Sequence, residues 1–272
     1  MRLNLTPRPL SHEEQRLYLY LESMDRNTFK VSELDLKKIG VAPNYLYVLV
    51  KRLEEKGWLT GVGKGVYLRL PASTAMEGRV YLEDPMEVAT KMFDGYIAFS
   101  SALKVHGLSE YEPFTIYVAT KIKSETVTLL KDYEIRAVKF GRRCTGFEKK
   151  EKYTVSTISK TFFDCFYRPK YAGGYSEVLK SIHRAEKIDW KEFEKYLDKF
   201  GSSSLCQKIG YMLSLLKETE FELPKDLFSY LSNRVKSKTR LDFGRSGGAY
   251  NREWMIIDNI GKKNLISWWY NG

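Results

Sequence analysis

The segment Gly57–Leu70, GWLTGVGKGVYLRL, combines closely spaced glycines with a lysine, as loops that bind phosphate often do. A Walker A loop has the pattern G-x-x-x-x-G-K-[ST] and lies between a strand and a helix. At that spacing Gly63-Lys64 would need a glycine at the place of Trp58, and Gly65 stands where a serine or threonine is required. We therefore interpret the segment as a β-hairpin whose glycines supply the positive φ angles of the turn.

Residues that could act in catalysis are few and scattered. The three histidines, His12, His106 and His183, lie far apart, without a cysteine or histidine at metal-ligand spacing. Asp132 followed by Glu148-x-Lys150 imitates the order of acidic residues and lysine in metal-dependent nucleases. In a chain that is 29% charged such a pattern arises easily by chance, and FEKKEKY is typical of an exposed turn. We expect no catalytic residue, no metal and no cofactor, and keep a nuclease as an alternative.

The charge of the chain favours a polyanionic partner. Its 45 Lys and Arg residues against 34 Asp and Glu give a net charge of +11 and a pI near 9.3. A basic protein with a solvated surface is the alternative. No apolar run approaches the roughly 18 to 20 residues of a membrane span, and the N-terminus lacks the apolar region of a signal peptide. The three cysteines, Cys144, Cys165 and Cys206, are widely spaced, so we expect a cytoplasmic protein with no membrane partner.

Helical patterns precede the hairpin. Ser11-x-x-Glu14 is a capping box that predicts a first helix. A second short helix is expected from a cap at Ser32 to Lys38, closed by Gly40, and a third from Pro43 to Lys56. Three helices followed by a glycine-tipped hairpin is the order of a winged helix-turn-helix. We assign this DNA-binding domain to residues 1–72.

The third helix has an apolar face, formed by Leu46, Leu49, Val50 and Leu53, and an opposite face that is uncharged or basic over its N-terminal half. The predicted DNA-binding residues are Asn44, Tyr45, Tyr47, Val48, Lys51 and Arg52 on this helix and Lys64 at the hairpin tip. Asn44 is suited to an adenine edge and Val48 to a thymine methyl group, the tyrosines to phosphate or base edges, and the three cations to phosphates. The alternative is a winged helix that contacts protein, with these residues solvated.

After a loosely composed linker beyond Pro71, residues 73–272 are expected to form a larger mixed α/β domain, so that the whole chain is α+β. Strands are predicted at 114–119, 133–140, 153–157, 240–243 and 253–260, with helices between them. Between Lys225 and Glu253, seven basic residues against three acidic ones give a local charge of +4. The residues of this basic segment that are predicted to contact DNA or an acidic partner are Arg234, Lys236, Lys238, Arg240 and Arg245. The alternative is a basic loop that is simply solvated. Trp268, Trp269 and Tyr270 are expected to pack into the domain.

Three segments of this larger domain carry a resemblance to a known family. They are YIAFSSALKVHGLSEYEPFTIYVAT (96–120), TISKTFFDCFYRPKYAGGYSEVLKSI (157–182) and RLDFGRSGGAYNREWMIIDNI (240–260). Together with the N-terminal winged helix, their order resembles that of the AbiEi antitoxins of type IV toxin–antitoxin, or abortive-infection, systems. The C-terminal NLISWWYNG has no counterpart in that pattern. Within the second segment, Asp164 and Arg168 are spaced for an i,i+4 ion pair, which we interpret as part of a scaffold.

The resemblance implies a transcriptional repressor of its own operon that binds inverted repeats as paired copies. It also implies an antitoxin that counteracts a nucleotidyltransferase-like toxin encoded nearby, with the C-terminal domain supporting neutralisation. Besides the nuclease, an atypical phosphotransferase that modifies the toxin remains an alternative, as does a module that binds only protein.

Overall fold

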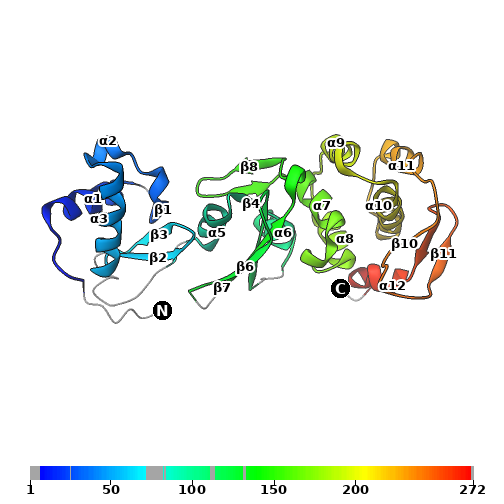
Figure 1. Ribbon diagram of the computed structural model, residues 1–272. Helices are drawn as coiled ribbons and strands as arrows, with labels where there is room; N and C mark the ends of the chain where they lie inside the picture. The colour runs from blue at the N-terminus through cyan, green and yellow to red at the C-terminus, as the bar shows by residue number, and fades with distance from the viewer. Residues whose placement is uncertain are drawn as a thin grey trace. The chain divides into compact units, whose positions relative to one another are not determined.

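The computed structural model describes residues 7–24, 26–71, 82, 84–110, 114–130 and 133–270, and shows a mixed α+β chain (Figure 1). It divides into two compact units. Unit 1 comprises Met1–Ile97, Phe114–Gly141 and Lys149–Thr154, and unit 2 comprises Ala98–Pro113, Arg142–Glu148 and Val155–Gly272. The expected domain boundary after residue 72, and the expected linker, lie outside the described residues.

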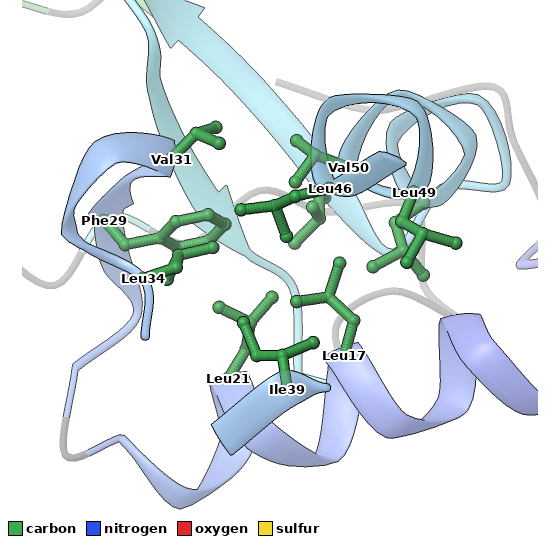
Figure 2. Close-up of a cluster of buried hydrophobic side chains, with 11 residues drawn as sticks. Leu17, Leu21, Phe29, Val31, Leu34, Ile39, Leu46, Leu49 and Val50 are labelled. Atoms are coloured by element: carbon green, nitrogen blue, oxygen red, sulfur yellow. The ribbon is translucent and has the colours of Figure 1, made fainter. Parts of the chain in front are cut away.

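The first part of unit 1, residues 7–70, is called the N-terminal module here. Its elements are α1 (His12–Ser23), β1 (Thr28–Lys30), η1 (Val31–Glu33), α2 (Leu36–Ile39), α3 (Pro43–Glu55), β2 (Leu59–Gly63) and β3 (Val66–Arg69). The three strands form an antiparallel sheet in the order β1-β3-β2. Helices and sheet enclose one apolar core, in which Leu17 and Leu21 of α1 meet Leu46 and Leu49 of α3 (Figure 2). Each such leucine, buried to 2% exposure or less, contributes about 1.5–3 kcal/mol to folding.

The capping signals fix most helix ends of the module. Ser11 and Glu14 form the predicted capping box, with the Ser11 amide donating to Glu14 Oε2 over 2.7 Å. The predicted cap of the second helix is wrong: Ser32 lies in η1, and α2 begins instead after Asp35, whose carboxylate accepts from the amides of Lys37 and Lys38. Asp35 prevails because its carboxylate satisfies two of the helix's first amides.

The ends of the third helix and its hairpin follow from proline and glycine. Pro43 opens α3 at its first position, and the helix ends before Gly57, which has φ +78°. The hairpin turn is Lys64-Gly65, with φ +53° and +72°, between the paired residues Gly63 and Val66. Positive φ at both central residues is the type I′ arrangement that suits the twist of a two-residue hairpin. Strand β2 extends to Gly63, with a register shift between Gly61 and Gly63.

The rest of unit 1 pairs a helix with the larger sheet. It contains α5 (Pro85–Phe93), β4 (Gly95–Ile97), β5 (Thr115–Thr120), β6 (Glu125–Leu129) and β7 (Tyr133–Lys139). With β8 (Phe147–Lys149) and β9 (Thr154–Ser156) the strand order is β6-β7-β5-β4-β9-β8. Strands β5 and β7 are parallel, and β6 is antiparallel to β7. Three of these strands, β4, β6 and β8, were not predicted, and β8 occupies the expected exposed turn.

Unit 2 is mainly helical. Its helices are α6 (Phe99–Val105), α7 (Ile158–Tyr167), α8 (Tyr175–Arg184), α9 (Trp190–Phe200), α10 (Ser203–Leu215), α11 (Lys225–Ser232), α12 (Lys262–Leu265) and α13 (Ser267–Tyr270), with short turns η3 (Pro169–Tyr171) and η4 (Leu216–Thr219). Three short strands, β10 (Thr239–Arg240), β11 (Ala249–Asn251) and β12 (Ile256–Asp258), form a sheet in the order β10-β12-β11. The late strands are thus shorter than predicted, and β11 was not anticipated.

The expected ion pair on α7 is wrong. Asp164 pairs with Lys160, one turn earlier, and both side chains are fully buried. The Lys160 ammonium also lies 5.4 Å from the Phe163 ring centroid. Arg168 instead lies over the ring of Tyr167, at 5.5 Å. The buried position of Asp164 accounts for the choice, because a buried carboxylate requires a partner that is itself held inside the core.

Candidate nucleic-acid interface

Helix α3 presents two contrasting faces. Leu46, Leu49, Val50 and Leu53 are at most 2% exposed, as the helical spacing predicts. The opposite face is open to solvent in the described part of the chain: Asn44, Tyr47, Val48, Lys51 and Arg52 are all exposed, with Tyr47 at 62% and Val48 at 42%. This surface offers apolar contacts from a tyrosine and a valine, hydrogen bonds from an asparagine, and charge from two cations. We call these five residues the α3 face.

Tyr45 lies beside the α3 face and is already engaged. Its hydroxyl donates to Glu13 Oε2 of α1 over 2.5 Å, and this hydrogen bond raises the pKa of Tyr45. The Arg52 guanidinium donates to the same hydroxyl over 3.4 Å and lies 5.9 Å from the ring centroid. Tyr45 therefore links α1 to α3 and orients Arg52.

Glu54 organises the cation of the next turn. Its Oε2 lies 2.8 Å from the Lys51 ammonium, and the hydrogen bond raises the pKa of Lys51. The other oxygen, Oε1, accepts from the amide of Gly61 on β2 over 2.9 Å. One carboxylate thus sets the hairpin against α3 and holds Lys51, whose side chain is 64% exposed, on the outer side of the helix.

Lys64 is at the hairpin tip as predicted, but it has a partner. Its ammonium lies 2.8 Å from Oε2 of Glu125 on β6 and 4.9 Å from the Phe93 ring centroid. Lys123 approaches the same carboxylate oxygen at 3.0 Å. Hydrogen bonds from Lys64 and then Lys123 hold the pKa of Glu125 below its ordinary value, so the carboxylate is ionised at neutral pH.

The predicted basic residues near the C-terminus belong to unit 2 and differ in their surroundings. Arg234 pairs with Asp198 and lies 3.7 Å from the Tyr230 ring centroid, so it ties α11 to α9. Lys238 lies 4.9 Å from the Tyr250 ring centroid, and Arg245 pairs with Asp242 at 3.3 Å. Lys236 is exposed, and Arg240 is half-buried in β10. The structure therefore gathers the α3 set on one helix, whereas in the C-terminal set only Arg240 lies in a strand, β10, and the other four residues lie in turns and loops.

The histidines, the C-terminal aromatic residues and the nuclease-like residues named from the sequence form no common site in the described part of the chain. His106 lies 2.7 Å from the carbonyl oxygen of Ser156, and His183 lies 3.2 Å from that of Thr219. Trp268 and Trp269 pack against His183, whereas Tyr270 is 61% exposed. Glu148 lies on β8, and Asp132 falls outside the described residues. Across the described ranges, no group of three or more His, Cys, Asp or Glu side chains is placed to hold a metal ion.

The residues that sequence reasoning missed are the acidic partners Glu13, Glu54 and Glu125. The spacing of Glu54 from Lys51, three residues along a helix, was a visible signal. Glu13 and Glu125 are separated from Tyr45 and Lys64 by 32 and 61 residues and left no local signal. In the part of the chain that the structure describes, no helix has both the length and the apolar character needed to cross a membrane.

No protein-family model and no curated protein matches the sequence. Among solved structures, the RV2827C protein from Mycobacterium tuberculosis is similar over nearly the whole chain. The match covers 95% of each chain at 14% sequence identity, with a TM-score of 0.60. At this identity the similarity shows a shared fold, a mixed arrangement of helices and several sheets.

Proposed function

We propose that this chain is a sequence-specific DNA-binding protein in which the N-terminal module acts as a winged helix-turn-helix. In this proposal α3 is the recognition helix and the β2–β3 hairpin is the wing. The observation that carries it is the α3 face: five side chains suited to DNA stand in solvent on a helix whose opposite side is completely buried. A helix held rigidly by its core can enter the major groove without first being released.

The side chains divide into reading and positioning roles. Asn44 is near the N-terminal end of α3, where recognition helices reach base edges, and its amide suits adenine. Val48, one turn later, suits a thymine methyl group. Lys51 and Arg52 come next along the helix and contact phosphates, as Lys64 does from the wing. If these three cations and the basic residues of the C-terminal set together neutralise about five phosphates per copy, the log–log salt dependence of binding has a slope of about −4 to −5.

The biological role proposed with this activity is that of a cytoplasmic repressor and antitoxin. It rests on the resemblance of the three segments in residues 96–260 to AbiEi antitoxins, and on the basic charge of the chain. Paired copies would bind an inverted repeat in the operator, and a nucleotidyltransferase-like toxin would be the protein partner. The described cysteines are buried and none of them forms a disulfide, which is consistent with a reducing compartment. Co-expression with such a toxin from the neighbouring gene tests neutralisation separately from DNA binding.

DNA recognition can be tested with duplexes selected by the full-length protein from a random pool. Asn44→Ala should weaken binding to the selected duplex about tenfold and leave a scrambled duplex unaffected, since one bidentate base contact discriminates by about 1–3 kcal/mol. Lys51→Gln should weaken binding to both duplexes alike. The matched control is Lys191→Gln on α9, because the Lys191 side chain is 71% exposed, close to the 64% of Lys51, and also forms an i,i+3 pair, with Glu194 in unit 2. Failure to enrich any duplex, or equal losses on both duplexes for Asn44→Ala, would contradict the proposal.

A further inference from the structure

Unit 2 contains a cavity that DNA recognition by α3 does not use. Its volume is about 540 Å³, within the range of about 300–1,000 Å³ typical of sites for small molecules. Four segments line it: η3 with the start of α8, α10, the loop after β10, and the chain around α12. The cavity is therefore formed by the packing of unit 2, rather than by a single loop.

The charged side chains of this cavity are mostly cationic. Lys170, Lys208 and Arg245 line it from three separate segments, against one carboxylate, Asp242. That carboxylate is already engaged, because it pairs with Arg245 at 3.3 Å and accepts from the Gly244 amide over 2.8 Å. The lining thus carries a net charge of +2 (three cations less one carboxylate), which is suited to an anion with two charges.

Of the three cations, Lys208 is half-buried, whereas Lys170 and Arg245 are exposed. Its ammonium donates to the carbonyl oxygen of Leu241 over 2.8 Å and lies 4.6 Å from the Phe243 ring centroid. Burial lowers the pKa of Lys208, and Asp242 acts in the opposite direction. An ammonium has three N–H donors, so this partly desolvated group retains the capacity to bind an anionic oxygen in the cavity.

Backbone donors complete the cationic side of the cavity. Helix α8 begins at Tyr175, and its N-cap, Gly174, supplies no side-chain hydrogen bond to the first turn. The cavity is lined there by Gly173, Gly174, Tyr175 and Ser176. The Gly174 amide already donates to the carbonyl oxygen of Pro169 over 2.8 Å. A Cβ atom at Gly174 would meet nothing within 4 Å, so the approach to the first amides of the helix, at Tyr175 and Ser176, is open. The first amides and the dipole of a helix favour a negatively charged oxygen at this position.

The rest of the lining is apolar and aromatic. Tyr175 and Phe243 contribute rings, and Leu241, Ile260 and Leu265 contribute aliphatic surface. Phe243 is 74% exposed, which is an unusual position for so large an apolar ring. Rings beside a cationic group match a ligand in which a planar ring is joined to a phosphate. We propose that this cavity binds a nucleoside monophosphate, with the phosphate held by Lys208, Arg245 and the start of α8, and the base against Phe243.

The test is calorimetric titration of the full-length protein with nucleoside monophosphates, the matching nucleosides and inorganic phosphate. At least one monophosphate should bind, and its nucleoside should bind at least tenfold more weakly. Arg245→Gln and Lys208→Met should each weaken binding of the monophosphate about tenfold. The matched control is Lys217→Met, because Lys217 lies over the Phe228 ring at 4.2 Å outside the cavity. Circular dichroism checks that each variant folds. If Lys208→Met does not fold, Arg245→Gln still tests the proposal, because the Arg245 side chain is 59% exposed and its replacement should not affect folding.

A further variant, Phe243→Leu, and titrations with oligonucleotides distinguish a nucleoside monophosphate from inorganic phosphate and from the phosphates of DNA. Phe243→Leu should weaken the monophosphate several-fold and leave inorganic phosphate unchanged. Binding of the nucleoside as tight as that of the monophosphate would overturn the proposal, as would an unchanged affinity in Arg245→Gln. If only oligonucleotides bind here and monophosphates do not, the cavity is a contact for DNA backbone and the proposal is wrong. The Asn44→Ala experiment tests DNA recognition by α3 independently of these results.

Discussion

The ammonium of Lys64, at the tip of the β2–β3 hairpin, lies 2.8 Å from a carboxylate oxygen of Glu125 on β6. Lys64 is also the one residue of the two-residue turn that is not glycine, at φ +53°. The turn of the hairpin therefore carries a cation, and the carboxylate of Glu125 neutralises it. For Lys64 to contact a DNA phosphate, as proposed, it must exchange the carboxylate of Glu125 for that phosphate.

Removing the charge of Glu125 should strengthen DNA binding. In Glu125→Gln, Lys64 no longer gives up an ion pair when it binds DNA, so the affinity for DNA should rise by up to about fivefold. The gain should appear on selected and scrambled duplexes alike in gel-shift titrations. Glu134→Gln is the matched control, because Glu134 pairs with Arg136 at 3.2 Å in the neighbouring strand and changes the net charge equally. Equal gains in both variants would show a general effect of net charge.

Replacing Lys64 should separate the charge of the tip from the shape of the turn. Lys64→Asn should preserve thermal stability, since asparagine adopts positive φ more readily than lysine and is favoured in type I′ turns. Affinity for all duplexes should fall about threefold to tenfold, and the magnitude of the salt slope should decrease by about one. Lys64→Arg, which retains the charge, serves as the control. A salt slope unchanged in Lys64→Asn would mean that the tip does not contact phosphate.

Local signals predicted the N-terminal module well. Pro43 and Gly57 delimit α3, the Ser11–Glu14 capping box opens α1, and the spacing of four apolar residues identified the buried face of α3. The prediction failed where two local signals competed: Ser32 and Asp35 can both cap a helix, and Asp35 prevails by accepting from two amides. The glycine pattern of residues 57–65 predicted a hairpin, and only the φ angles identify its turn as Lys64-Gly65.

Long-range pairing explains most of what could not be predicted. Strands β4, β8 and β11 have three residues each, too few for an alternating pattern to stand out. Arg234 stands in a basic run, and nothing local indicates that its partner is Asp198, 36 residues earlier. The Lys160–Asp164 pair could be seen as an i,i+4 spacing, as could Asp164–Arg168. Only burial distinguishes the two pairs, and burial is set by the packing of α7.

Glu14 should make the stability of the N-terminal module depend on pH. Burial alone raises the pKa of Glu14, but hydrogen bonds from Lys56 and Ser11 outweigh it and leave the pKa below its ordinary value of 4.5. A depressed pKa means that Glu14 stabilises the fold above the unfolded-state pKa and that this contribution is lost as pH falls through the folded-state pKa. Glutamine also serves in a capping box, so Glu14→Gln removes mainly the ion pair with Lys56, whose ammonium is 2.5 Å away.

The free energy of unfolding should therefore be about 1–2 kcal/mol lower in Glu14→Gln than in the wild type at pH 7. The difference should begin to shrink near pH 4.5, where the carboxyl group of the unfolded chain takes up a proton, and should be lost as pH falls through the lower pKa of the folded state. Urea unfolding followed by far-UV circular dichroism at several pH values measures it. Glu55→Gln, an exposed change on α3, is the control and should show little difference at any pH. A difference that is constant with pH would rule out the charge of Glu14 as its cause.

Replacing one member of the buried Lys160–Asp164 pair on α7 should lower the free energy of unfolding much more than replacing both. Lys160→Met leaves the carboxylate of Asp164 without its cation inside the core, and breaking such pairs costs about 3–5 kcal/mol. The double variant Lys160→Met with Asp164→Leu should recover most of that loss, since neither charge then remains buried. Urea unfolding followed by tryptophan fluorescence reports on this region, because four of the five tryptophans (Trp190, Trp254, Trp268 and Trp269) lie in unit 2. Lys191→Met, at an exposed ion pair on α9, is the control. A double variant as unstable as Lys160→Met alone would show that the packing of the Lys160 methylene groups, rather than the missing cation beside Asp164, determines the loss of stability.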